Sequence, residues 1–346
     1  MTVRKRPTQR EVALRAGVSQ AVVSQVLNGK GSAIRLAPET RERVLSAMRD
    51  LGYVPNAAAR RLAGGLGHVI GVFTYERLFP THASDFYHPF LEGIEEEAER
   101  LGYDLLLHTR PPRAGAPRPL FEDGGSRLRL ADGTLLLGEL NAERRAELAR
   151  LVDEGHPVVF IGRRELPGHD IPYVAADYAG ATEEALGVLL DLGHRQVAYL
   201  GSGREGESVA DRRAGYERGM GAPGLTPVYP DLTPAVFGAF TAFLVENDDL
   251  ARQLLHLAES QGLSAPRDFS FVVLGDPLGG VGEAPWAAFE IPRAQMGRRA
   301  LSLLDRQLHG GEVTAEVLAC CWHGGPSLGP PGVTEPNQSL GSGGAA

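Results

Sequence analysis

The spacing of hydrophobic residues along this chain changes once and divides it into two parts. Up to about residue 65, apolar positions recur three or four residues apart, which is the period of amphipathic helices. From His68 onward, short apolar runs alternate with longer amphipathic segments, a pattern typical of parallel sheets with crossover helices. The sequence therefore predicts a small all-α N-terminal part followed by a larger α/β body.

The stretch from Thr8 to Asn28 has the signals of a helix-turn-helix. Thr8, followed three residues later by Glu11, forms a capping box at the start of a first helix. Gly17 can take the left-handed conformation that ends this helix, and Ser19 can cap a second one. The residues expected to pack the two helices together are Val12 and Ala13 of the first and Val23, Val26 and Leu27 of the second.

The opposite face of the second helix is small and polar, and consists of Gln20, Ala21, Ser24 and Gln25. Glutamine amides can read base edges in a major groove, so this face is a candidate recognition surface. The alternative is a plain solvated face.

A third helix closes the small unit. Lys30 and Arg35, in the loop before it, are placed to contact backbone phosphate. Pro38 suits the first turn of this helix, and Gly52 ends it. Ala37 occupies the cap position, where the missing side-chain acceptor weakens the helix start by ~1 kcal/mol. The apolar residues at helical spacing are Val44, Leu45, Met48 and Leu51.

A short helix is predicted between Asn56 and Gly64. It has a capping Asn and two arginines but only about two turns, and a helix that short is marginal alone in water. We expect it to need a partner or DNA to form.

The apolar pattern predicts nine strands and six helices in the body, between residues 69 and 308. The predicted strands are Val69–Phe73, Tyr103–Leu107, Thr134–Leu137, Val158–Ile161, Tyr173–Ala175, Val197–Leu200, Ala239–Val245, Phe269–Leu274 and Ala287–Ile291. The predicted helices are Pro89–Arg100, Ala142–Glu154, Tyr178–Leu192, Ser208–Met220, Asp249–Gln261 and Ala294–Leu308. Gly201 to Gly206 matches G-x-G-x-x-G but lacks the acidic residue that would hold a ribose, so we interpret it as a flexible βα loop.

Charge is distributed unevenly along the chain. The net charge is -8, yet residues 1–65 hold 12 Lys or Arg against 4 Asp or Glu, and the remainder holds 23 against 39. A basic module on an acidic body is typical of a nucleic-acid reader joined to another domain. A solvated basic face without a partner is the alternative.

Composition narrows the class of protein further. Hydrophobic residues make up 43% and charged residues 23%, as in ordinary globular proteins, and no apolar run is long enough to span a membrane. The basic start of the chain is followed by a polar amphipathic helix, which predicts a cytoplasmic protein. The two cysteines, Cys320 and Cys321, are adjacent, a spacing that fits neither a disulfide framework nor a metal site. We expect no cofactor, no metal site and no catalytic residues.

Three motifs together resemble one family. They are V-A-x-x-A-G-V-S-x-x-x-V-S-x-V-L-N, P-x-T-R-x-R-V and L-G-Y-x-P-N-x-x-A-R-x-L, within residues 8–65. This segment closely resembles the DNA-binding headpiece and hinge of the LacI/GalR family of bacterial transcription repressors, and the similarity continues more patchily to about residue 323. Val22 departs from the family, which usually has a Thr there.

The resemblance implies how the headpiece meets DNA. Gln20, Ala21 and Gln25 fall where the family reads major-groove bases. Leu62, with Asn56 and Ala59 beside it, falls where paired hinge helices wedge a leucine into a minor-groove step and kink the DNA; ordinary packing is the alternative for Leu62. The complete DNA-binding set is Thr8, Ser19, Gln20, Ala21, Ser24, Gln25, Asn28, Lys30, Arg35, Tyr53, Asn56, Ala59, Arg60 and Leu62.

The resemblance also implies the domain organisation. A helix-turn-helix headpiece spans 1–52, a hinge helix and linker 53–67, and a two-lobed periplasmic-binding-protein-like body of doubly wound parallel sheets 68–323. Lobe 1 is expected at about 68–161 and 291–310, and lobe 2 at about 162–290 and 311–323, joined by three crossings. The Gly-, Pro- and Ser-rich segment 324–346 is predicted to be disordered.

An effector is expected in the cleft between the lobes, beyond the carboxyl ends of the strands. The candidates are Tyr75, Asp85, Phe86, Phe90, Arg163, Asp177, Arg212, Asn247 and Asp276. Arg212, Asn247 and Asp276 match the family motifs best. Carboxylates, amides and guanidinium groups suit a polyhydroxyl ligand such as a sugar, and Phe86 or Trp286 could stack on a sugar face. For each residue alone, a salt bridge or a helix cap is the alternative.

The combined interpretation is a homodimeric transcriptional regulator, a repressor, that binds palindromic double-stranded operator DNA and responds to a small polar effector. Departures from the family make a dimer that binds no effector the alternative. Residues 108–132 are poor in helix formers, the segment 216–239 is shorter than in the family, and Glu246 stands where a small residue is usual. A sugar-binding protein without a regulatory role and a sugar-active enzyme are the rivals from other classes. The headpiece disfavours the first, and no catalytic constellation supports the second.

Overall fold

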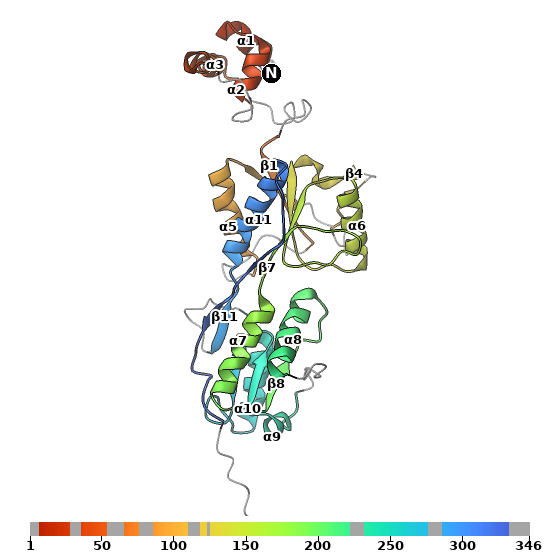
Figure 1. Ribbon diagram of the computed structural model, residues 1–346, viewed down its shortest axis with the longest axis vertical. Helices are drawn as coiled ribbons and strands as arrows, with labels where there is room; N and C mark the ends of the chain where they lie inside the picture. The colour runs from red at the N-terminus through yellow and green to blue at the C-terminus, as the bar shows by residue number, and fades with distance from the viewer. Residues whose placement is uncertain are drawn as a thin grey trace, which may run out of the picture. The chain divides into compact units, whose positions relative to one another are not determined.

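The computed structural model describes residues 7–27, 36–53, 66–75, 86–109, 118–122, 125–221, 232–275 and 286–331. The chain separates into two compact units, Met1–Val69 and Ile70–Ala346 (Figure 1). Within the described residues, no helix is both long and apolar enough to cross a membrane.

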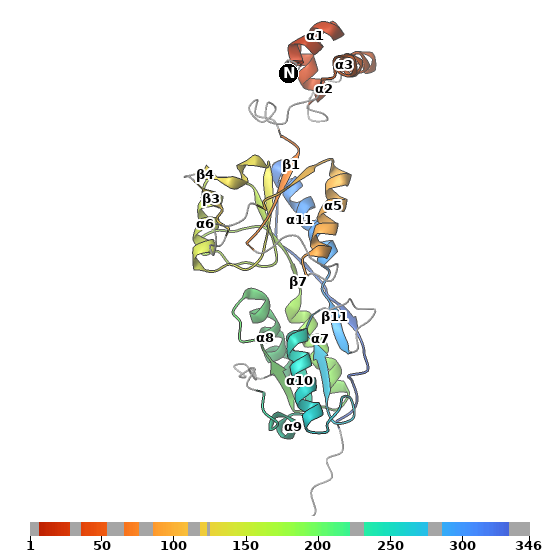
Figure 2. The same cartoon turned by 180° about the vertical axis from the view of Figure 1, so that it is seen from behind.

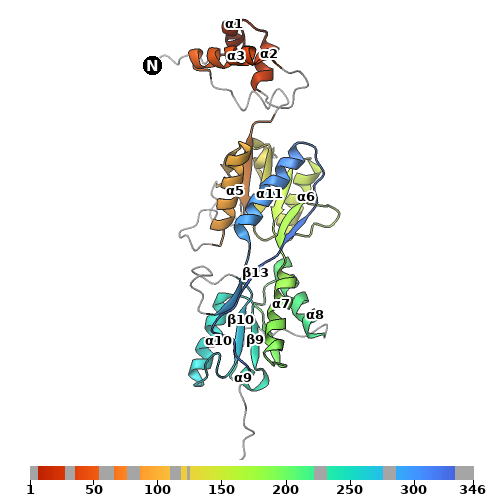
Figure 3. The same cartoon turned by 60° about the vertical axis from the view of Figure 1, so that its left-hand side comes forward.

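The small unit is a bundle of three helices: α1 (Gln9–Ala16), α2 (Gln20–Leu27) and α3 (Pro38–Leu51) (Figure 3). The predicted capping box is confirmed, since the Thr8 and Glu11 side chains each accept from the other residue's backbone amide. Gly17 ends α1 at φ 64°. Ala37 makes no side-chain cap bond to α3, as expected. The buried core consists of Val12, Ala13, Ala16, Val23, Val44 and Ala47, with Val26, Leu27, Met48 and Leu51 partly buried around it.

The larger unit contains two main sheets. The first has the order β12-β7-β6-β5-β1-β2. Its strands are β1 (Val69–Thr74), β2 (Asp104–Leu107), β5 (Gly133–Leu137), β6 (Val158–Ile161), β7 (Tyr173–Ala176) and β12 (Glu316–Leu318). The pairings from β12 through to β1 are parallel.

Helices cover both faces of this first sheet. On one face, α5 (His88–Leu101) and α11 (Arg293–Leu308) lie side by side over Ile70, Val72 and Leu135 (Figures 1 and 2). On the other face, Leu148 and Leu151 of α6 (Ala142–Asp153) pack on residues of β5 and β6. A hairpin of β3 (Phe121–Glu122) and β4 (Gly125–Ser126) and a 3₁₀ turn (Arg127–Leu130) precede β5.

The second sheet has the order β13-β11-β10-β9-β8. Its strands are β8 (Val197–Leu200), β9 (Ala242–Val245), β10 (Ser270–Val273), β11 (Ala287–Glu290) and β13 (Cys321–His323), which runs antiparallel to β11. One face carries α7 (Tyr178–Asp191) and α8 (Glu207–Met220). The other carries α9 (Val236–Ala239) and α10 (Asp248–Ser260). The predicted α/β class with doubly wound parallel sheets is thereby confirmed.

The chain passes between the two sheets three times, after β7, after β11 and after β12 (Figure 2). The first and third crossings differ from the expected lobe boundaries. β7 pairs with β6, and β12 pairs with β7, so residues 173–176 and 316–318 belong to the first lobe and not the second. The first crossing therefore falls at Asp177, well after the expected residue 162.

Two other expectations were wrong in part. The strand predicted to begin at Ala239 begins at Ala242, because Val236–Ala239 forms the short helix α9. The segment predicted to be disordered is ordered from residue 324 to 331: Ser327 is buried, its Oγ accepts from the Ala287 amide at 2.8 Å, and it donates to the Phe271 carbonyl at 2.7 Å. Residues 332–346 lie outside the described residues.

Candidate DNA-binding and effector-binding sites

The solvent-facing side of α2 is the candidate base-reading surface. Gln20 and Ala21 are exposed, and Ser24 and Gln25 are partly exposed. Val23 of the same helix is buried against α1 and α3, which fixes the side of α2 that faces outward. Ser19 precedes the helix, and its Oγ accepts from the Val22 amide at 3.4 Å. A rigid helix thus presents the glutamines away from the core.

The other headpiece candidates have structural partners. The Thr8 hydroxyl donates to Glu11 at 3.0 Å within the capping box. Tyr53 is partly buried against the small core, and its amide donates to the Met48 carbonyl at 2.9 Å. These contacts do not test whether Thr8 and Tyr53 bind DNA, so that role stays a prediction. Asn28, Lys30, Arg35, Asn56, Ala59, Arg60 and Leu62 lie outside the described residues, as does the predicted hinge helix.

A cavity of about 120 Å³ lies between the lobes of the larger unit. Its floor is formed where β5, β6 and β7 end, and α7 and α8 of the second lobe close it. Of the predicted effector residues, Phe86, Phe90 and Arg163 line this cavity. Arg212 adjoins it, since its guanidinium lies 4.0 Å from the ring centre of Tyr178, which lines the cavity.

The remaining described candidates do not line the cavity. Asp177 caps α7 by accepting from the Gly180 amide at 2.8 Å, and Asn247 caps α10 by accepting from Leu250 at 3.0 Å. Both side chains therefore take the structural alternative of a helix cap. Tyr75 is buried beside Phe73, with Arg144 over its ring, and burial raises the pKa of its hydroxyl. Asp85 and Asp276 lie outside the described residues.

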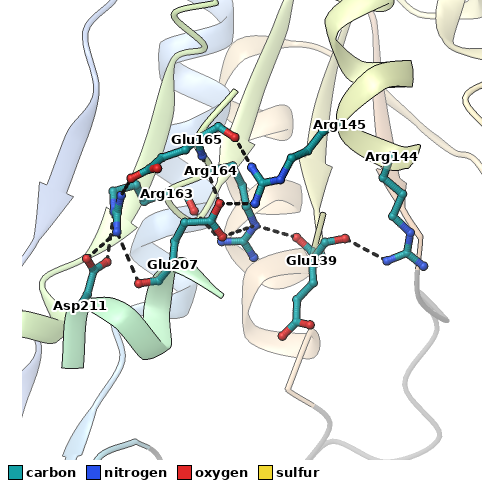
Figure 4. Close-up of polar contacts among 9 residues, drawn as sticks. Glu139, Arg144, Arg145, Arg163, Arg164, Glu165, Glu207 and Asp211 are labelled. Atoms are coloured by element: carbon teal, nitrogen blue, oxygen red, sulfur yellow. Dashed lines mark hydrogen bonds and ion pairs between the residues drawn. The ribbon is translucent and has the colours of Figure 1, made fainter. Parts of the chain in front are cut away.

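Arg163 spans the two lobes. It follows β6 in the first lobe and binds Asp211 of α8 in the second through two hydrogen bonds, Nη2 to Oδ1 at 2.6 Å and Nε to Oδ2 at 3.2 Å (Figure 4). Such bidentate, charge-assisted pairs are among the stronger polar contacts in proteins. The Asp211 carboxylate accordingly raises the pKa of Arg163.

A second bridge joins the lobes one turn earlier on α8. Glu207 accepts from Nη2 of Arg145 at 2.7 Å and from the Glu165 amide at 3.1 Å (Figure 4). Burial would raise the pKa of Glu207, but the hydrogen bonds from Arg145 and from backbone amides outweigh it and hold the pKa below its ordinary value. Two ion pairs of the chain's own side chains therefore bridge the lobes beside the cavity.

Sequence reasoning missed Arg164 as a cavity residue. Its side chain is only 12% exposed and lines the cavity, and burial lowers its pKa. It also missed Arg145, Glu207 and Asp211. The signal was present in Gly162-Arg163-Arg164, but nothing local in the sequence shows that the second arginine is the buried one.

Three segments match known family descriptions. Residues 8–56 match the bacterial regulatory proteins of the lacI family. Residues 77–234 match the periplasmic binding proteins and sugar binding domain of the LacI family, and residues 186–322 match the periplasmic binding protein-like domain. The helix-turn-helix and the two-lobed body therefore define a DNA-binding regulator with a binding-protein-like domain.

Individual regulators are similar to this chain in sequence and structure over nearly its whole length. The regulator GntR of Pseudomonas aeruginosa is 30% identical, covering 90% of this chain and 92% of its own, and CelR of Thermobifida fusca is 29% identical, covering 92% and 96%. A CelR–cellobiose complex is 25% identical with a TM-score of 0.60, covering 93% of this chain and 100% of its own. The Lac repressor dimer bound to operator has a TM-score of 0.65 at 22% identity, covering 93% and 99%, and supports the fold. The chain belongs to the LacI family of transcriptional regulators.

Proposed function

We propose that this protein is a homodimeric repressor that binds a palindromic operator. Each α2 helix enters a major groove, and the paired hinge segments place Leu62 in the minor groove at the centre of the site. The observation that carries the proposal is the outward face of α2, where Gln20 and Gln25 stand clear of a core closed by Val23. The positive charge of residues 1–65 supports phosphate contact by the same unit.

The cleft between the lobes is the proposed effector site. The related CelR was solved as a complex with cellobiose, which supports a sugar or a related polar compound as the effector class. Arg163, Phe86 and Phe90 already line the cavity between the lobes. Ligand binding there would change the distance between the lobes and, through it, the affinity for DNA, which is a coupling between two sites.

Base reading is tested by changing one glutamine at a time. Gln25→Ala should change base preference by ~1–3 kcal/mol at one position of each half-site, because a bidentate amide contact is lost there. Gln20→Ala should act at a different position. Gln261→Ala, an exposed glutamine of α10's C-terminal end, is the matched control and should leave binding unchanged. A uniform loss of affinity across all DNA sequences would contradict base reading by these residues.

An effector-blind dimer is the second candidate. It is favoured by the two interlobe bridges, Arg163–Asp211 and Arg145–Glu207, which join the lobes through the chain's own side chains. The cavity of about 120 Å³ is also below the ~300–1,000 Å³ of common ligand pockets. Operator affinity measured against a panel of sugars and related metabolites separates the two. A shift of tenfold or more, roughly 1.4 kcal/mol of coupling, supports the ligand-gated protein, and its absence across the panel supports the blind one.

A further inference from the structure

The arginines around the interlobe cavity are not all matched by buried carboxylates. Arg145 and Arg163 each bind a carboxylate of α8. Arg164 and Arg212 donate instead to backbone carbonyls, and Arg212 also lies over the Tyr178 ring. Within the described residues, this cleft therefore holds more buried positive charge than buried negative charge.

Among the described residues, no carboxylate lies at hydrogen-bond distance from Arg164. Its Nε donates to the Gly138 carbonyl at 3.0 Å and its Nη1 to the Arg163 carbonyl at 2.6 Å. The Oε2 atom of Glu207 forms an ion pair with Nε at 3.9 Å, beyond hydrogen-bond range, while the same carboxylate binds Arg145 at 2.7 Å. A carbonyl dipole compensates a buried cation less than a carboxylate does, so part of the cost of desolvating Arg164 is not recovered. Burial lowers the pKa of Arg164 below its ordinary value, which agrees with incomplete compensation of its charge.

Nearby exposed carboxylates do not change this balance. Glu165 contacts Arg163, but its side chain is 73% exposed, and Glu139 is exposed as well. Water and salt screen both charges. Arg145 and Arg164 therefore share one buried carboxylate, Glu207, and the excess positive charge lies at the cavity wall, at Arg164.

The cavity wall also contains four aromatic residues. Phe86, Tyr87, Phe90 and Tyr178 line it together with Arg164. Aromatic faces suit the C–H face of a sugar ring or carbon chain. The wall thus offers two cationic groups, Arg163 and Arg164, and a surface for a carbon skeleton.

We propose that the effector of this cleft is a small anion, a polyhydroxylated compound carrying a carboxylate or a phosphate group that binds Arg164 and Arg163. This rests on the proposed function, in which the cleft is the effector site. Glu207 forms ion pairs with Arg145 and Arg164, and Asp211 binds Arg163, so the anionic group competes with these two carboxylates. The competition ties ligand binding to the contacts that bridge the lobes.

The test uses the full-length protein and matched ligands that differ in charge. Glucose, glucuronate and glucose 6-phosphate share one skeleton with a neutral, a carboxylate and a phosphate group, and equivalent sets are made for galactose and mannose. Inorganic phosphate is the probe that does not depend on the skeleton. Binding is measured by calorimetry and by the shift in thermal unfolding, with chloride at equal ionic strength as the reference.

The expected result is that the anionic member of at least one set, or inorganic phosphate, stabilises the protein more than the neutral sugar does. Arg164→Gln should weaken that binding by about ten- to a hundredfold, as expected for loss of a hydrogen bond to a charged group. Arg218→Gln, in which a 55% exposed arginine of α8 is changed, is the matched control and should not alter it. The carboxylate and phosphate arms distinguish the two kinds of anion.

Glu207→Gln is a second variant that tests the same proposal if Arg164→Gln fails to fold. It leaves Arg164 in place and removes a competing charge, so it should strengthen binding of the anion more than binding of the matched neutral sugar. Preferred binding of neutral sugars, or no stabilisation by any anion relative to chloride, would overturn the proposal. Anion binding that survives Arg164→Gln would also overturn it. Operator binding by the same preparation separates these outcomes from failure of the proposed function, since a protein that binds operator but no anion loses only this inference.

Discussion

Val23→Ala tests whether the small core holds the base-reading helix in place. Val23 is fully buried between α1 and α3. Removing two methyl groups costs about 0.8 kcal/mol each in transfer free energy. With the cavity left behind, the total loss is about 2–3 kcal/mol. Because a unit of about 50 residues has only about 2–7 kcal/mol of stability, this is a large fraction.

The assay is amide hydrogen exchange on the full-length protein. Protection in α1, α2 and α3 should fall by about 30- to 150-fold, which is 2–3 kcal/mol converted at 1.4 kcal/mol per factor of ten. Exchange in the larger unit should not change, because it has separate cores. As temperature rises, the fraction of folded headpiece falls and the apparent Kd for operator rises with it.

Leu14→Ala is the control for this experiment. It removes more carbon atoms than Val23→Ala, but Leu14 is 86% exposed, so the change should stay within about 0.5 kcal/mol. Equal effects of the two substitutions would refute the reasoning that burial at Val23 sets the stability of the headpiece.

Two further predictions concern the larger unit. Gly215→Ala should destabilise it by about 1–3 kcal/mol in denaturant unfolding, because a Cβ there would lie 2.2 Å from the Ala179 carbonyl oxygen. Gly187→Ala is the control: it has open space around it and should stabilise the unit by up to about 1 kcal/mol. Equal effects of the two substitutions would contradict tight packing of α7 on α8. Burial lowers the pKa of His108 to about 4 from an ordinary value near 6.5. Below pH 6.5 His108 of the unfolded chain therefore binds a proton that it does not bind in the folded protein. The free energy of unfolding should fall by about 3 kcal/mol between pH 6.5 and pH 4. His108→Gln should remove this part of the pH dependence, and an unchanged dependence in the variant would show that His108 is not its source.

Local signals in the sequence predicted much of the fold. The capping box of Thr8 and Glu11, the end of α1 at Gly17 and the strands Val158–Ile161 and Val197–Leu200 were predicted as the structure has them. Caps, left-handed glycines and short apolar runs act through neighbours in the chain, so they can be read without knowing the tertiary structure.

Contacts between distant residues could not be predicted in the same way. The order of residues 324–331 depends on Ser327 bonding to Ala287 and Phe271, and composition carries no sign of those partners. Arg163 was predicted as a cleft residue from its place after a strand, but its partner Asp211 is 48 residues away. The burial of Arg164 next to it likewise depends on how the two lobes meet.

The most direct test of the central claim is the affinity of the full-length protein for DNA upstream of its own gene, measured by fluorescence anisotropy against unrelated DNA of equal length over a range of salt concentrations. Specific binding should be at least about a thousandfold tighter than binding to unrelated DNA, and both should weaken as salt rises. Equal affinity for the two DNAs at every salt concentration would contradict a sequence-specific regulator that acts at that site.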